Sequence, residues 1–312
     1  HLAWPPAGPP GGRLAVSWIG DPAGPFTQSI TLPASAPPAG LVEIHPVREG
    51  VASPVPVPMR LTSLAAAHEA EPNGSPGEAT AAAAPAGLCG QLGEPDDVDW
   101  FRVTAPKGSK WHVRSWGRRL GSPIDLVVNL YRDDAKRARI TGNDDAEGPD
   151  ALAQLTVPEE GSFLVRVNDH QRRGGPEFVY WIEVEPMLPE VNVSVPPART
   201  TTQEGLVAAV PQGNRTALLL NTARTEFGGP ARVTISDLPA GVVAHVPDAA
   251  GNAPATLAVF EAAADAPATT TMAAVQVAAA ETGQPLGGLR QKTELVFGQP
   301  NNAPYRIAVG DR

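Results

Sequence analysis

Two short acidic segments contain the residue types that bind hard metal ions. The first is Glu69-Ala-Glu-Pro-Asn73, and the second is Asp96-Asp-Val-Asp-Trp-Phe101. Glu71 precedes a proline, which favours an extended backbone at Glu71. Side chains alternate along an extended chain, so Glu69, Glu71 and Asn73 share one side. Because carboxylate and amide oxygens suit Ca²⁺, the two segments predict a divalent-ion site at the mouth of a β-sandwich.

A solvated loop is the alternative interpretation of these segments. In that case Asp96 or Asp97 would cap a turn, and Glu69 would face water. Calcium takes about six to eight oxygen ligands, and the two segments offer at most six side chains. A calcium site would therefore need backbone carbonyls as well.

Trp116 and Arg118 form the candidate ligand surface outside the acidic segments. Indole and guanidinium groups can make a stacking and cation–π surface for sugars or peptides. Both residues fall near the end of a predicted strand, where the loops of a sandwich often have functional roles. The alternative is that Trp116 belongs to the core, which is the commoner place for a tryptophan in a sandwich.

Other reactive residue types point to structural roles. Cys89 follows Gly87-Leu88 and is interpreted as a small packed residue. The six histidines are dispersed without zinc-site spacing, and no Gly-x-Ser-x-Gly motif is present. We therefore expect no enzymatic activity. A second acidic patch is interpreted as a loop between strands, with metal binding as the alternative; it comprises Asp144, Asp145, Glu147 and Asp150.

Composition limits the class of protein. The chain has 312 residues, enough for two or three domains, and a formal charge of −9. Its basic residues are scattered, so we expect no nucleic-acid partner. No apolar run approaches the ~20 residues that cross a bilayer, so we expect no membrane span. The chain starts at His1, and we expect any targeting signal to have been removed or to lie outside this sequence.

Short alternating runs between Pro/Gly turns predict an all-β fold of serial antiparallel β-sandwich modules, the middle one jelly-roll-like. We predict a small Ig-like module at 1–62, which would dock on its neighbour or lack a strand, a sandwich at 63–186 and an Ig-like sandwich at 187–312. Residues 63–69 are expected to form a linker or a helical turn. In the strand at 178–185, Glu183 and Glu185 are expected on a solvated face. The other predicted strands lie around 14–18, 30–32, 42–44, 57–61, 98–103, 110–116, 125–131, 151–157, 162–168, 191–195, 206–210, 216–221, 231–236, 257–261, 270–278 and 305–309.

Residues 69–185 resemble the bacterial pre-peptidase C-terminal domain. The resemblance rests on the segments 69–73, 97–101, 124–131, 143–145 and 161–167. The flanks resemble the Ig-like modules of large exported bacterial proteins. The resemblance implies a jelly-roll-like sandwich and a Ca²⁺ cofactor. Carried over by position, the ligands are Glu69, Glu71, Asn73, Asp96 and Asp99, with Asp97 as an alternate. Gly74 stands where Asn or Asp often follows, which favours one ion.

These observations predict non-catalytic binding or spacer modules of an exported bacterial protein, located outside the cell, in the periplasm or at the cell surface. The ion would pin 69–73 against 96–99 and fix the angle between the first two modules. Expected partners are neighbouring domains of the same protein, an extracellular protein or polysaccharide, or further copies of the chain. The alternatives are a structural subunit of a cell-surface fibre or layer, and an accessory region of a secreted hydrolase.

Overall fold

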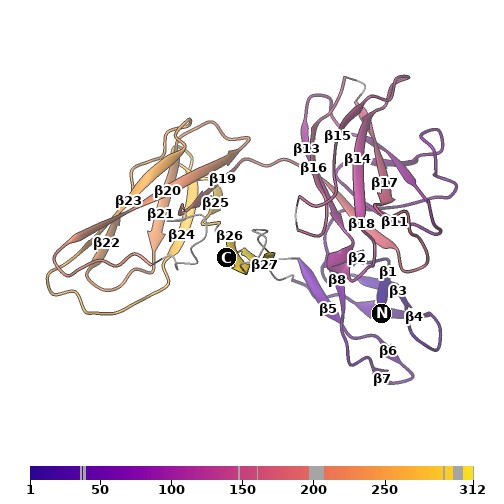
Figure 1. Cartoon of the computed structure of the whole chain (residues 1–312), viewed down its shortest axis with the longest axis horizontal. Helices are drawn as coiled ribbons and strands as arrows, with labels where there is room; N and C mark the ends of the chain where they lie inside the picture. Colours follow the sequence, from indigo (N-terminus) through magenta and orange to yellow (C-terminus); the bar gives the residue numbers. More distant parts are fainter. Residues whose placement is uncertain are drawn as a thin grey trace. The chain divides into compact units, whose positions relative to one another are not determined.

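The structure is a computed structural model that describes residues 1–35, 37, 40–146, 148–159, 161–196, 207–290, 292–297 and 305–311. It divides into two compact units, His1–Met187 and Leu188–Arg312. Strands dominate both units (Figure 1), which confirms the predicted all-β fold. Helical structure in the described residues is limited to the 3₁₀ turn η1 (Arg118–Leu120), and none of it is long and apolar enough to cross a membrane. The boundaries at residues 62 and 186 stay predictions. Within the first unit, we refer to residues 1–62 as the N-terminal module and to residues 63–187 as the sandwich.

The N-terminal module, residues 1–62, contains two three-stranded sheets. Its strands are β1 (Leu2–Trp4), β2 (Ala7–Gly8), β3 (Arg13–Ile19), β4 (Phe26–Thr31), β5 (Leu41–Ile44), β6 (Val47–Arg48), β7 (Val51–Ala52) and β8 (Val57–Leu61). One sheet has the order β1-β3-β4, the other has the order β2-β8-β5, and β6 and β7 form a separate hairpin. Alternation places Val16, Trp18 and Met59 in a buried core.

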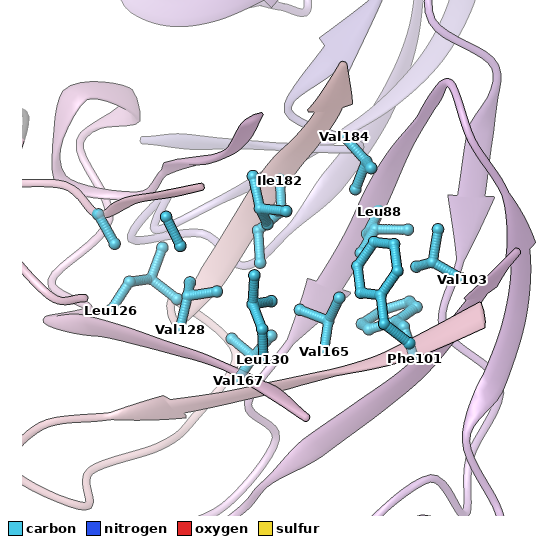
Figure 2. Packing of buried hydrophobic residues seen from close by; sticks show 14 of the residues in the cluster. Leu88, Phe101, Val103, Leu126, Val128, Leu130, Val165, Val167, Ile182 and Val184 are labelled. Atoms are coloured by element: carbon cyan, nitrogen blue, oxygen red, sulfur yellow. The ribbon is translucent and has the colours of Figure 1, made fainter. Parts of the chain in front are cut away.

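The sandwich, residues 63–187, contains two five-stranded sheets. Its strands are β9 (Ala66–His68), β10 (Thr80–Ala83), β11 (Ala86–Gln91), β12 (Asp99–Thr104), β13 (Lys110–Trp116), β14 (Leu126–Arg132), β15 (Arg139–Asn143), β16 (Leu152–Thr156), β17 (Ser162–Asp169) and β18 (Val179–Pro186). The sheet orders are β10-β12-β17-β14-β15 and β16-β13-β18-β11-β9. Figure 2 shows the core, in which Leu88, Phe101 and Ile182 pack between the sheets. Adjacent strands are antiparallel except β9–β11 and β10–β12.

Residues 66–68 differ from the prediction of a linker or helical turn. They form β9, which pairs in parallel with β11, with Ala66 opposite Gly87. Alanine favours helix intrinsically, but the ladder with β11 overrides that local preference. The strands β10, β11 and β15 were not predicted, because they are built mainly from Ala, Gly and polar residues with weak strand propensity.

The expected solvated face of β18 is also corrected. Tyr180, Ile182 and Val184 do point into the core, as predicted. On the opposite face, however, Trp181 and Glu183 are only 1% and 0% exposed. The N-terminal module covers this face, which alternation within a single strand cannot reveal.

The second unit contains two further sheets and a hairpin. Its strands are β19 (Glu190–Ser194), β20 (Arg215–Thr225), β21 (Ala231–Ser236), β22 (Val242–His245), β23 (Ala255–Ala262), β24 (Ala274–Ala279), β25 (Pro285–Gly288), β26 (Lys292–Phe297) and β27 (Tyr305–Asp311). The orders are β19-β20-β23-β22, β21-β24-β25 and β26-β27. Leu220, Ala258 and Val277 are buried in its core. Of the predicted strand at 206–210, residue 206 lies outside the described residues and 207–210 form no strand.

Candidate metal centre

The candidate metal centre lies where the segment after β9 meets the loop before β12. The backbone N–H of Trp100 donates a hydrogen bond to the carbonyl of Asn73 at 3.0 Å. The N–H of Asn73 donates to Oε2 of Glu71 at 2.9 Å. The first bond joins the two acidic segments, and the second orders the 69–73 segment itself.

Three carboxylates converge at this junction. Glu71, Asp97 and Asp99 each place one oxygen within 4.8 Å of the others. Asp99 is buried, Asp97 is half-buried and Glu71 is exposed. Two N–H groups fix Asp97, that of Gly93 at 2.6 Å from Oδ2 and that of Val98 at 2.7 Å from Oδ1. The cluster therefore extends from a buried carboxylate to one that is exposed to solvent.

Glu69 lies next to the floor of the cluster and interacts with Asp99. Its Oε1 accepts a hydrogen bond from the N–H of Gln91 at 2.9 Å. Burial, reinforced by the charge of Asp99, raises the pKa of Glu69 to about 9. Burial also raises the pKa of Asp99 to about 7, although the hydrogen bond from Tyr180 opposes that rise. Without a cation, Glu69 therefore keeps a proton at neutral pH, and a divalent ion has to displace it.

Tyr180 and Gly90 close the centre from below. Tyr180 is fully buried on β18, and its hydroxyl donates a hydrogen bond to Oδ2 of Asp99. A Cβ atom at position 90 would lie 2.0 Å from the Tyr180 hydroxyl oxygen and 2.5 Å from Oε2 of Glu69. Glycine at position 90 therefore leaves the room that the tyrosine and the glutamate occupy.

Several buried polar atoms of the centre have no hydrogen-bond partner among the described residues. They are Oε2 of Glu69, Oδ1 of Asp99, and both Oδ1 and Nδ2 of Asn73. A buried polar atom without a partner destabilises a fold by about 1–3 kcal/mol, so these oxygens fit an additional ligand such as a cation. The donor set is oxygen only, which suits Ca²⁺ or Mg²⁺ and disfavours Zn²⁺. Of the two ions, Ca²⁺ places fewer demands on ligand geometry, whereas Mg²⁺ requires a near-ideal octahedron.

The structure does not bring Asp96 into this cluster. Its backbone is left-handed, with a φ angle of 66°, and its side chain is 71% exposed. Its Oδ1 lies 3.8 Å from Nη1 of Arg172. Asp97, the alternate ligand by position, occupies the place in the cluster instead.

Trp116 does not lie on an open surface. It is 5% exposed, and its Nε1 donates to Oε2 of Glu183 at 3.0 Å. The guanidinium carbons of Arg60 and Arg119 lie 4.3 and 3.9 Å from its ring centroid. Arg118, at the start of η1, is exposed and pairs with Asp125 at 3.2 Å. The covered ring of Trp116 is part of an internal contact between the sandwich and the N-terminal module.

The second acidic patch contains a residue that clamps a turn. Asp150 is fully buried, and its Oδ1 accepts the N–H of Gly117 at 2.9 Å. Its Oδ2 accepts Nε of Arg119 at 2.7 Å. Asp150 therefore holds the turn that leads into η1. Asp145 is exposed, Asp144 is partly exposed, and Glu147 lies outside the described residues.

Tyr180 and Gly90 were not predicted as parts of the centre. Alternation along 178–185 does place Tyr180 in the core, and a buried tyrosine hydroxyl usually finds a polar partner. That signal indicates a buried acceptor but does not identify Asp99. For Gly90, the sequence contains no comparable signal.

No family model matches the chain, and no curated protein matches it. Among solved structures, the pre-peptidase C-terminal domain of a collagenase from Bacillus anthracis is similar, with 14% identity and a TM-score of 0.28. The likeness covers 38% of this chain and 100% of that chain. The functional inference therefore rests on the residues of the centre. Over that part of its length, the chain is similar to a pre-peptidase C-terminal domain, the family indicated by its sequence.

Proposed function

We propose that this chain is a set of non-catalytic β modules of an exported protein and that one Ca²⁺ ion stabilises its sandwich at the candidate metal centre. The observation that supports the ion is the convergence of Glu71, Asp97 and Asp99 beside two buried oxygens, Glu69 Oε2 and Asp99 Oδ1, that only a proton or a cation can satisfy. Like charges in so small a space repel each other unless a proton or a cation lies between them.

The ion would have a structural role. Glu71, Asp97 and Asp99 would bind it first, and Glu69 and Asn73 would complete the set together with backbone carbonyls. Bound in this way, it joins the segment after β9 to the loop before β12. Asp99 and Tyr180 are buried, so the ion would be anchored to the interior of the sandwich, as expected of a structural site.

Calorimetric titration with Ca²⁺ tests the proposal. The intact chain is compared with Glu71→Ala and Asp99→Asn, and the matched control is Asp96→Asn, since Asp96 is exposed and outside the cluster. We expect saturable binding in the wild type and the control, weaker binding in Glu71→Ala and no binding in Asp99→Asn. Absence of binding in the wild type, or equal binding in all four proteins, would contradict the proposal.

Limited proteolysis provides a second readout. If the ion joins the two acidic segments, Ca²⁺ should slow cleavage between Ser63 and Asp99, and chelator should restore it. Bound ligand also stabilises the folded state by about 2.7 kcal/mol when its concentration is 100 times Kd. The melting temperature should therefore rise with Ca²⁺. Equal cleavage rates and equal melting temperatures with and without Ca²⁺ would contradict a structural role for the ion.

A structural subunit of a surface fibre or layer is the second candidate function. The observation in its favour is an exposed apolar face on the second unit, where Leu219 of β20 lies opposite Leu257 of β23 and both are more than 40% exposed. Large exposed apolar patches often mark contacts between proteins. Concentration-dependent assembly in light scattering, reduced by Leu219→Ser, would favour this candidate. A monomer at all concentrations would favour a spacer. The proposed partners of such a spacer are neighbouring domains and an extracellular protein or polysaccharide.

A further inference from the structure

The outer face of β18 is buried although it points away from the sandwich core. Trp181 and Glu183 lie on this face. The residues that pack with Trp181 come from both modules, and the cluster comprises Ala7, Cys89, Trp116, Leu120 and Trp181, with Trp4, Leu41 and Leu64 against it. The N-terminal module is therefore docked on the sandwich through an apolar contact that includes the carboxylate of Glu183.

Four donors surround that carboxylate. From β8, Arg60 donates Nε to Oε1 of Glu183 at 2.7 Å and Nη2 to Oε2 at 3.1 Å. Trp116 and Trp181 donate their indole N–H groups at 3.0 and 3.4 Å. A two-point bond between arginine and carboxylate fixes distance and orientation together. The described residues place a cation of one module on a fully buried anion of the other.

Two glycines make the close approach possible. Gly40 has a φ angle of 67°, and a Cβ atom there would lie 1.6 Å from Nη1 of Arg60. A Cβ atom at Gly87 would lie 1.7 Å from the ring of Trp181. Because glycine has no Cβ atom at either position, the ion pair and the indole rings fit closely between the two modules.

The connection between the modules has little slack. Only residues 62–65 separate β8 from β9. The N–H of Thr62 donates to the carbonyl of Gly8 at 3.0 Å, on the N-terminal side. The N–H of Gly87 donates to the carbonyl of Ala65 at 2.9 Å, on the sandwich side. Both ends of the link are therefore fastened.

We infer that Arg60 and Glu183 form a joint that holds the N-terminal module and the sandwich as one rigid body, independently of any metal. Apolar burial favours docking but is not directional. The buried ion pair selects one orientation, because any other would leave Glu183 buried without its cation. The candidate metal centre uses side chains of the sandwich alone, so we assign the angle between these modules to the joint and not to the ion.

Cys89 provides a probe of this joint. It is the single cysteine of the chain, it is 0% exposed, and it packs in the contact cluster. Undocking would expose its thiol while the sandwich core stays folded. The rate of thiol alkylation in the intact chain therefore measures opening of the joint, and amide hydrogen exchange in β12 and β17 reports whether the sandwich remains folded.

The test compares wild type with Glu183→Gln and Arg60→Met, which remove the ion pair from either module. The matched control is Glu159→Gln, which breaks an exposed pair with Lys107 on the sandwich surface. We expect at least a tenfold faster alkylation in both joint variants, with unchanged protection in β12 and β17, and no change in the control. If one variant does not fold, the other decides the outcome.

Three results would overturn the inference. The first is an unchanged alkylation rate in a folded joint variant. The second is faster alkylation that occurs only together with lost protection in β12 and β17, because the whole sandwich would then be opening. The third is that chelator accelerates alkylation of the wild type as much as the joint substitutions do, which would show that the metal holds the two modules together. Failure of Ca²⁺ to bind would contradict the proposed function and leave the result at the joint unaffected.

Discussion

The hydroxyl of Tyr180 donates a hydrogen bond to Oδ2 of Asp99 in the interior of the sandwich. Tyr180 belongs to one sheet and Asp99 to the other, so the bond links both layers beneath the candidate metal centre. It supplies one donor to a carboxylate whose other oxygen has none among the described residues. The protein therefore supplies a hydrogen-bond donor to Oδ2 of Asp99 and leaves Oδ1 to a proton or a cation.

Substitution of Tyr180 by Phe should destabilise the sandwich. The change keeps the ring and removes the donor, so Oδ2 of Asp99 would be buried without a partner. We expect a loss of about 1–3 kcal/mol in the free energy of unfolding, measured by chemical denaturation in chelator. Tyr131→Phe is the control, since Tyr131 is only half-buried. An equal effect of the two substitutions would show that the bond to Asp99 adds nothing.

Stability in chelator should fall as pH rises. The pKa of Glu69 is raised from 4.5 to about 9 in the folded protein, so the folded state binds its proton more tightly than the unfolded state. This contribution to stability is complete below about pH 4.5 and is lost progressively up to about pH 9. Melting temperatures measured across this range should therefore decrease in chelator and change less in Ca²⁺. A melting temperature that is independent of pH in chelator would contradict the burial of Glu69.

Calcium affinity should rise with pH over the same range. Between about pH 7 and pH 9, where Glu69 holds a proton and Asp99 is ionised, binding releases one proton for each ion, and affinity should increase about tenfold per pH unit. Below about pH 7 Asp99 has to release a proton as well, so the dependence should be steeper. Calorimetry in buffers of different ionisation enthalpy counts the protons. The prediction fails if no proton is released at neutral pH.

Gly90→Ala should disrupt the candidate metal centre, whereas Gly93→Ala should be tolerated. A Cβ atom at position 90 would overlap the Tyr180 hydroxyl and Glu69, but at position 93 it would lie 3.7 Å from Oδ2 of Asp97, an ordinary contact. We expect Gly90→Ala to lower stability by about 1–3 kcal/mol through overpacking and to abolish Ca²⁺ binding. Similar calcium affinities for the two variants would show that the space at Gly90 is not needed.

Asp150→Asn should destabilise the turn before η1 without changing Ca²⁺ binding. The amide oxygen can still accept the N–H of Gly117, but Arg119 would lose its anionic partner. We expect a loss of about 1–3 kcal/mol in the free energy of unfolding, and Asp145→Asn, at an exposed loop position, serves as the control. A change in calcium affinity would contradict the separation of this turn from the metal centre.

Local sequence patterns predicted much of the fold. The strand predicted at 110–116 coincides with β13, and that at 162–168 matches β17 to within one residue. The first segment alternates between apolar and polar residues, and the second is rich in Phe, Leu and Val, and both patterns are local signals for a strand. The strands β9 and β10 lack such a signal. They form because they pair with β11 and β12, which lie about twenty residues further along the chain.

The sequence by itself determined the all-β class, the inward face of β18 and the presence of two acidic segments, because each depends on residues close together in the chain. Only the tertiary structure decided that Asp97 and not Asp96 joins the cluster, since the loop conformation sets which side chain turns inward. Only the tertiary structure decided that Glu183 is buried. Alternation shows which residues share a face of a strand, but what covers that face, water or the Arg60 side chain of another module, depends on contacts between residues 123 positions apart.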